Sequence, residues 1–187
     1  RLKERAPIYQ WLAKFFVCEI DSEAWKTLQV DGIRETLIRI EPSLEADLSS
    51  APNNERLESL CEEFARLFLL PGGVSPFASG WAKAAQAESQ TRDEIAQLVE
   101  QGLLALGRES LQPAPWGRLQ RDHIAVILDL VSAAGTSDDP KDQELGAHLE
   151  AELLAPCLAQ IGQGLADRAQ DPVYVALGRL IASLPLE

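Results

Sequence analysis

Histidine and cysteine side chains can support acid–base or metal chemistry, and this chain contains only two histidines and three cysteines. The two histidines, His123 and His148, lie far apart, and neither begins a His-x-x-x-His pair. The three cysteines, Cys18, Cys61 and Cys157, show no C-x-x-C spacing, which argues against a zinc or iron–sulfur site. We therefore expect no catalytic residues and no metal ligands.

A glycine pair, Gly72-Gly73, is the remaining feature that could take part in chemistry, because successive glycine amides can bind an anion. A glycine pair that follows an apolar helical stripe is more typical of a helix C-terminus. The sequence contains no P-loop, G-x-G-x-x-G or G-x-S-x-G motif. A nucleotide hydrolase is thus an alternative that rests on this pair alone.

The composition is that of a globular protein. Of the 187 residues, 46% are hydrophobic and 25% are charged, and this length favours one domain over residues 1–187. The net charge is −12, with 29 acidic and 17 basic side chains, so the surface repels nucleic acid. Such a surface would attract a basic peptide, although the charge could equally serve solubility alone.

Location signals point to the cytoplasm. No apolar run approaches the roughly 20 residues that a membrane-spanning helix needs, so we expect no membrane insertion. The opening segment Arg1-Leu2-Lys3-Glu4-Arg5 is not followed by the apolar region of a secretory signal. The odd number of well-separated cysteines fits a reducing compartment. Each cysteine falls at an apolar-periodic position, which predicts three buried thiols.

Helical periodicity runs through almost the whole chain. It predicts an all-α bundle of about eight or nine helices, with breaks near residues 71–79, 107–119 and 135–140 and a bend at Pro156. Predicted helix starts combine a polar cap with an apolar stripe: Asp21 or Ser22, Asn53 or Asn54, a capping box at residues 91–94, and Asp171-Pro172. The first predicted helix has Ile8, Leu12, Phe15 and Phe16 on one face.

Two segments go beyond generic helix. The first is LCEEFARLF (residues 60–68), which continues through PGG (71–73) to SPFAS (75–79), and the second is DHIAVILDL (122–130). Together they resemble the TorD/DmsD family of redox-enzyme maturation chaperones, which is related to the NarJ-type assembly factors. The segments RAPIYQWLA (5–13) and the region from His148 to Tyr174 are similar to the opening and closing parts of that family.

The resemblance implies a cytoplasmic, helical, non-catalytic protein. Its partner would be the precursor of a molybdenum-cofactor oxidoreductase, bound through a twin-arginine signal peptide and held until cofactor insertion. The family also implies a monomer or a domain-swapped dimer and, for some members, GTP as a bound nucleotide. The alternative from a different class is a helical adaptor or regulator that binds a folded partner.

A twin-arginine peptide needs carboxylates for its guanidinium groups and an aromatic-lined groove for its apolar stretch. Asp122 is also a candidate helix N-cap, His123 a candidate loop contact, and Phe68 and Trp81 candidate core or loop anchors. The expected client-binding residues are Glu63, Phe68, Pro76, Phe77, Ser79, Trp81, Asp122, His123 and Asp129.

Overall fold

The computed structural model describes residues 2–81, 88–108 and 119–184. Within these ranges the chain is helical and contains no strand, which confirms the all-α prediction. Ten α-helices lie in the described residues, slightly more than expected, because short helices divide the N-terminal half. They are α1 (Leu2–Lys14), α2 (Ser22–Leu28), α3 (Ile33–Ile40), α4 (Leu44–Asp47), α5 (Asn54–Phe64), α6 (Glu88–Ala105), α7 (Ile124–Thr136), α8 (Pro140–Leu149), α9 (Leu158–Arg168) and α10 (Pro172–Ala182).

Three shorter turns extend or link these helices. They are the π-helical turns η1 (Ala65–Leu69) and η4 (Glu150–Leu154) and the 3-10 helix η2 (Ala78–Gly80). The contacts between residues divide the chain into two compact units. Of the described residues, unit 1 contains 2–17, 75–81, 88–108 and 119–158, and unit 2 contains 18–74 and 159–184. A single domain over residues 1–187 stays a prediction.

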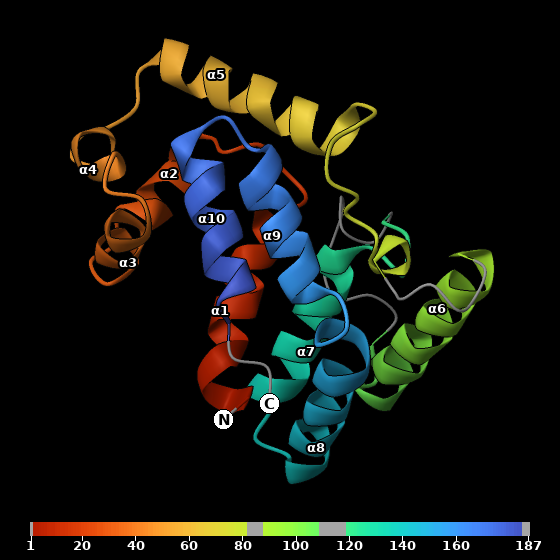
Figure 1. Cartoon of the computed structure of the whole chain (residues 1–187). Helices are drawn as coiled ribbons and strands as arrows, with labels where there is room; N and C mark the ends of the chain where they lie inside the picture. Colours follow the sequence, from red (N-terminus) through yellow and green to blue (C-terminus); the bar gives the residue numbers. More distant parts are fainter. Residues whose placement is uncertain (1, 82–87, 109–118, 185–187) are drawn as a thin grey trace. The chain divides into compact units, whose positions relative to one another are not determined.

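Unit 1 is built around α7, which is buried along most of its length and packs against α1 and α8 (Figure 1). Such all-round burial follows from its sequence, IAVILDLVSAAGT, whose apolar residues surround the helix axis. Helix α6 packs against α7, α8 and η2. The core of unit 1 therefore holds in place both the start of α7 and the segment around η2.

An ion pair with a buried carboxylate joins α1 to η4 in unit 1. Arg5 on α1 donates two hydrogen bonds to Glu150, of 3.0 Å from Nε to Oε1 and 2.7 Å from Nη2 to Oε2. The Tyr9 hydroxyl donates to the same carboxylate. The hydrogen bond to Glu150 raises the pKa of Arg5, and burial raises the pKa of Tyr9. Glu150 is the first residue of η4, so this ion pair connects α1 to the π-helical turn.

Unit 2 packs α10 against α3 and brings α9 and α10 into close contact (Figure 1). A Cβ placed on Gly178 would lie 2.5 Å from the Ala166 backbone nitrogen, and one on Gly162 would lie 2.5 Å from that of Ala182. The absence of side chains at these two glycines therefore sets how closely the helices approach.

Three predicted helix caps are confirmed. The side chain of Asp21 accepts a 2.8 Å hydrogen bond from the backbone of Ala24, and Asn53 accepts one of 2.8 Å from Arg56. Asp171 accepts one of 2.9 Å from the backbone amide of Val173, and Pro172 occupies the first helical position. The predicted helix end at the glycine pair also agrees, because α5 continues into η1, which ends at Leu69.

Several sequence-based expectations are wrong. The capping box at residues 91–94 lies inside α6, which begins at Glu88. Ile8 is 38% exposed, because the buried face of α1 instead runs through Tyr9 and Leu12. Cys18 is exposed because α1 has ended before it, and Cys61 is exposed because it lies about 100° around α5 from the buried Leu60.

The remaining cysteine, Cys157, is buried as expected, and burial raises the pKa of its thiol to about 12. Residues 109–118 of the predicted break at 107–119 lie outside the described residues. In the part of the chain that the structure describes, we found no helix with the length and hydropathy required to cross a bilayer.

Candidate functional site

A short segment of residues 75–81, here called the strap, is fastened to the start of α7. The Ala78 amide donates a 2.8 Å hydrogen bond to the Asp122 carbonyl, and the Ile124 amide donates one of 2.8 Å to the Pro76 carbonyl. These bonds form an isolated antiparallel bridge between Phe77 and His123. Two segments that are distant in the sequence therefore meet within unit 1, as the sequence analysis expected.

The Asp122 side chain is buried, with only 1% of its surface exposed. Its Oδ2 accepts a 2.6 Å hydrogen bond from the Ser79 hydroxyl and lies 3.3 Å from Nε of Arg92. Its Oδ1 has no hydrogen-bond partner among the described residues. The carboxylate thus makes internal contacts through one oxygen and leaves the other unsatisfied.

His123, not Asp122, is the N-cap of α7, which corrects the proposed cap by one residue. Its Nδ1 accepts a 3.2 Å hydrogen bond from the Ala125 amide, so the ring proton sits on Nε2. The ring meets that of Phe77 edge to face, with 5.5 Å between centroids. Burial lowers the pKa of His123 to about 4, although the charge of Asp122 acts in the opposite direction. The imidazole is therefore neutral at pH 7.

Trp81 and Ser79 complete this cluster. The indole Nε1 of Trp81 donates a 2.8 Å hydrogen bond to the Ser75 carbonyl, which closes the strap on itself. Pro76, Phe77 and Trp81 are half-buried, whereas Ser79 is buried. The structure thus brings together six of the nine predicted residues, namely Pro76, Phe77, Ser79, Trp81, Asp122 and His123.

Glu63 and Phe68 belong to unit 2. Arg66 donates hydrogen bonds of 2.7 and 2.8 Å to the Glu63 carboxylate, and the backbone amides of Gln170 and Asp171 also donate to it. Burial opposes ionisation, but these hydrogen bonds hold the pKa of Glu63 below its usual value. Phe68 packs on Phe64 and Tyr174, with centroids 5.2 and 6.4 Å away. Both residues have internal partners within unit 2.

Asp129, the ninth predicted residue, is buried within α7 and is 5% exposed. It lies in unit 1 with the cluster, on the central helix rather than on the strap. Its carboxylate is thus part of the interior of this unit. A site on the surface of unit 1 must draw its exposed carboxylates from other elements.

An apolar hollow in unit 1 supplies such carboxylates, and no short sequence pattern indicated it. Its volume is about 210 Å³, and its walls come from the strap, α6 and the turn from η4 to α9. Glu94 and Glu152 are exposed at this hollow, whereas Leu153 and Cys157 are buried beneath it. The lining residues are Ala78, Thr91, Glu94, Ile95, Leu98, Glu152, Leu153, Pro156 and Cys157.

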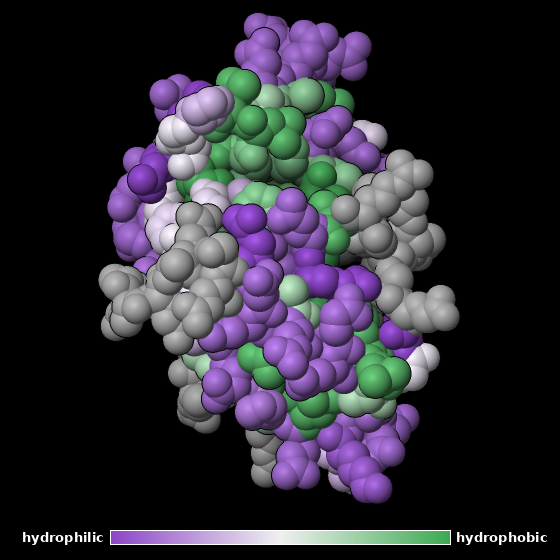
Figure 2. Space-filling view, turned by 90° about the vertical axis from the view of Figure 1, so that its right-hand side faces the viewer, coloured by the Kyte–Doolittle hydropathy of each residue, from purple (hydrophilic) through white to green (hydrophobic). Residues whose placement is uncertain are grey.

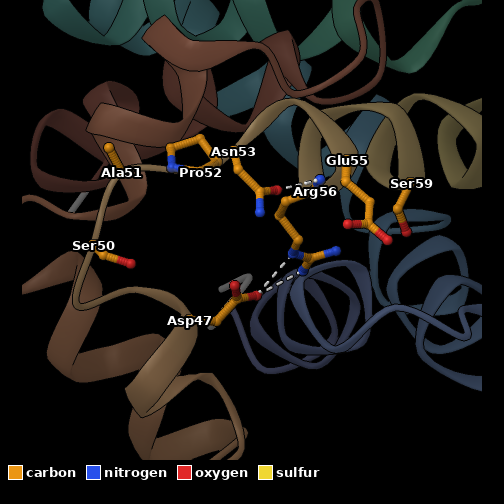
Figure 3. Close-up of a pocket in the computed structure, with 8 residues that line it drawn as sticks. All are labelled: Asp47, Ser50, Ala51, Pro52, Asn53, Glu55, Arg56 and Ser59. Atoms are coloured by element: carbon orange, nitrogen blue, oxygen red, sulfur yellow. Dashed lines mark hydrogen bonds and ion pairs between the residues drawn. The ribbon is translucent and has the colours of Figure 1, made fainter.

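A larger, polar pocket of about 440 Å³ lies in unit 2, at the start of α5 (Figure 3). Figure 3 shows Arg56 reaching Asp47, with 2.7 Å between Nη2 and Oδ2. The same guanidinium donates to Asp171 and lies 5.6 Å from the centre of the Trp25 ring. Because these groups already engage it, Arg56 joins the elements of unit 2 and is not a free ligand for an anion.

The surface of the protein is mixed in hydropathy on the face seen in Figure 2. Figure 2 shows hydrophobic patches separated by broad hydrophilic areas. Among the described residues, no group of three or more histidine, cysteine, aspartate or glutamate side chains is placed to hold a metal ion. The strap, fastened to the start of α7, thus lies beside an apolar hollow at which two carboxylates are exposed.

The comparison with known families gives the class of this protein. The family model described as nitrate reductase delta subunit matches residues 29–163, well over half of the chain, and the protein belongs to that family. Its members are assembly chaperones of molybdoenzymes and not enzymes, so the resemblance to the maturation chaperones is confirmed. The family binds the catalytic subunit of nitrate reductase during maturation. No curated protein and no solved structure matches the chain.

Proposed function

We propose that this chaperone binds the precursor of a molybdoenzyme catalytic subunit in the cytoplasm. It recognises a twin-arginine leader and holds the apoenzyme until the cofactor is inserted, before export. Family membership supports the client class, and the net charge of −12 supports a basic segment as the recognised part. A monomer or domain-swapped dimer, and GTP as a bound nucleotide, stay predictions from the resemblance.

The hollow in unit 1 is the observation that carries the proposal. Ile95 and Leu98 on α6 line it together with Leu153, which suits the apolar stretch of a leader. Glu94 and Glu152 are exposed at the same hollow and can each pair with a guanidinium. Apolar walls and negative charge therefore occur together, as a leader with two arginines and an apolar stretch requires.

The strap cluster forms the second part of the proposed site. The half-buried rings of Phe77 and Trp81 would contact the leader directly, while Asp122 and His123 are buried beside them in the free protein. The other three predicted residues are buried or internally bonded, namely Glu63, Phe68 and Asp129. We propose that they do not contact the leader and contribute to binding only by stabilising the units in which they lie.

The test is a titration of the protein with a fluorescent peptide in which two adjacent arginines precede an apolar stretch. We expect a micromolar or tighter dissociation constant that weakens as salt is added, because the paired groups are exposed. Changing both peptide arginines to glutamine should abolish the salt dependence and most of the affinity. An unchanged affinity would favour the adaptor alternative.

The matched variants change two carboxylates at a time. Glu94→Gln with Glu152→Gln should weaken binding by about 0.5–2 kcal/mol, the sum expected for two exposed ion pairs. The control pair, Glu55→Gln with Glu62→Gln, removes the same charge from exposed positions of unit 2. Equal weakening by both pairs would mean that the leader responds to net charge and not to the hollow.

A further inference from the structure

Arg92 contacts the buried carboxylate of the proposed site from inside the protein. We propose that Arg92 is an internal competitor for the client: its guanidinium occupies Asp122 in the free chaperone and gives way to an arginine of the leader. This inference rests on the proposed function, and it concerns the regulation of the same site.

The geometry of this contact is incomplete. Nε of Arg92 lies 3.3 Å from Oδ2 of Asp122, and the same oxygen already accepts the 2.6 Å hydrogen bond from Ser79. Oδ1 has no partner among the described residues. The Arg92 side chain is 44% exposed, whereas that of Asp122 is 1% exposed. A surface arginine thus covers a buried carboxylate without satisfying it.

Two other buried carboxylates of this protein are fully paired with an arginine. Arg5 donates to both oxygens of Glu150, at 3.0 and 2.7 Å. Arg66 likewise donates to both oxygens of Glu63, at 2.7 and 2.8 Å. Two parallel hydrogen bonds are the favoured geometry of guanidinium and carboxylate. Asp122 departs from it, so a better-placed guanidinium has an oxygen left to bind.

The Arg92–Asp122 ion pair lies close to the hollow. Arg92 follows Thr91 on α6, and Thr91 is one of the residues that line the hollow. Ser79 follows Ala78 on the strap, and Ala78 lines the same hollow. The Ala78 amide also donates to the Asp122 carbonyl, so the Asp122 cluster adjoins the hollow through the strap. A leader seated there would bring its own guanidinium close to Asp122.

Replacement of Arg92 exchanges one guanidinium for another, so the buried charge of Asp122 stays paired throughout. The displaced side chain is long and already partly in solvent, where its loss of one contact has a small effect. An incoming lysine has a single compact ammonium and cannot form the two-bond fork. The mechanism therefore predicts that the leader needs arginine rather than lysine at the position that meets Asp122.

The experiment compares two variants in the same peptide titration. Arg92→Gln removes the competitor. Arg121→Gln is the control, because Arg121 is 28% exposed, pairs with Glu100 on α6 and carries the same charge. Arg92→Gln should bind the twin-arginine peptide about twofold to fivefold more tightly than Arg121→Gln, as expected for the release of a partly exposed ion pair. The gain should be smaller with a twin-lysine peptide.

Equal or weaker binding by Arg92→Gln, with binding by the unaltered protein intact, would overturn the competitor while leaving the proposed function standing. A wild-type protein that binds no peptide would overturn both. A second measurement needs no variant. In the NMR spectrum of the unaltered protein, the Nε–H resonance of Arg92 should shift when the peptide saturates the site. A resonance that does not move would also overturn the competitor.

Discussion

The Ser79 hydroxyl donates a 2.6 Å hydrogen bond to the Asp122 carboxylate, and this bond joins the strap to the start of α7. Both side chains are buried, at 4% and 1% exposed. The Ser79 hydroxyl therefore supplies a hydrogen bond to a buried carboxylate that water does not reach. It also keeps the strap beside the hollow in which we propose that the client leader binds.

Ser79→Ala should lower the free energy of unfolding by about 1–3 kcal/mol, the usual effect of removing a hydrogen bond from a buried charged group. Urea denaturation measures this change. Ser183→Ala is the matched control, since the Ser183 hydroxyl donates to the Leu180 carbonyl in an exposed position. A loss at Ser79 no larger than at Ser183 would show that the hydrogen bond to Asp122 contributes little.

Glu150→Gln should destabilise the protein by about 3–5 kcal/mol, because it breaks a buried ion pair and leaves Arg5 without its countercharge. Glu152→Gln, two residues later and exposed, should change stability by less than about 0.5 kcal/mol. In the peptide titration the order should reverse. Glu152→Gln should weaken binding more than Glu150→Gln, because of these two residues only Glu152 is expected to contact the leader. Thermal denaturation beside the titration checks both effects.

The buried imidazole of His123 predicts a loss of stability in mild acid. The unfolded chain takes up this proton near the usual pKa of 6.5, and the folded chain only near pH 4. The unfolded state therefore binds more protons between these values, so stability is full above about pH 6.5 and falls as the pH drops to about 4, by about 3 kcal/mol.

His123→Asn should remove this part of the pH dependence, since asparagine can cap α7 but does not titrate. His148→Gln serves as the control, because His148 is exposed. Free energies of unfolding measured from pH 4 to pH 7 should have a shallower slope for His123→Asn than for the control. Parallel slopes would contradict the assignment of a depressed pKa to His123.

Gly178→Ala should destabilise unit 2 by about 1–3 kcal/mol, the usual effect of overpacking, because the new Cβ would lie 2.5 Å from the Ala166 nitrogen. Alanine is otherwise the better helix former, by about 1 kcal/mol. At the exposed Ala159 of α9, the reverse change to glycine should therefore also destabilise. Stabilisation by Gly178→Ala in urea denaturation would mean that α9 and α10 can separate without loss.

Local features of the fold were predictable from the sequence. Asp21, Asn53 and Asp171 cap their helices through hydrogen bonds that span two or three residues, so the signal and the contact lie in the same short segment. The pattern at Thr91 failed because a threonine followed by glutamate three residues later also fits the interior of a helix.

The candidate site was predictable only in part. The meeting of Phe77 with His123 followed from the two family-like segments, and the structure places them in one bridge. The burial of Asp122 and its contact with Arg92 depend on how α6 packs against the rest of unit 1, which no short pattern encodes. The same holds for the hollow, because the turn after Glu150 contributes to its wall.

The chain order of the two units has a consequence for synthesis. The polypeptide leaves unit 1 after residue 17, returns to it at residue 75, and completes unit 2 only with residues 159–184. As the chain emerges from the ribosome, its first helix must wait for α7 and α8 before it can bury its apolar face. Neither unit can therefore be obtained as one continuous segment of the chain, and the apolar face of α1 has no packing partner until α7 and α8 have been made.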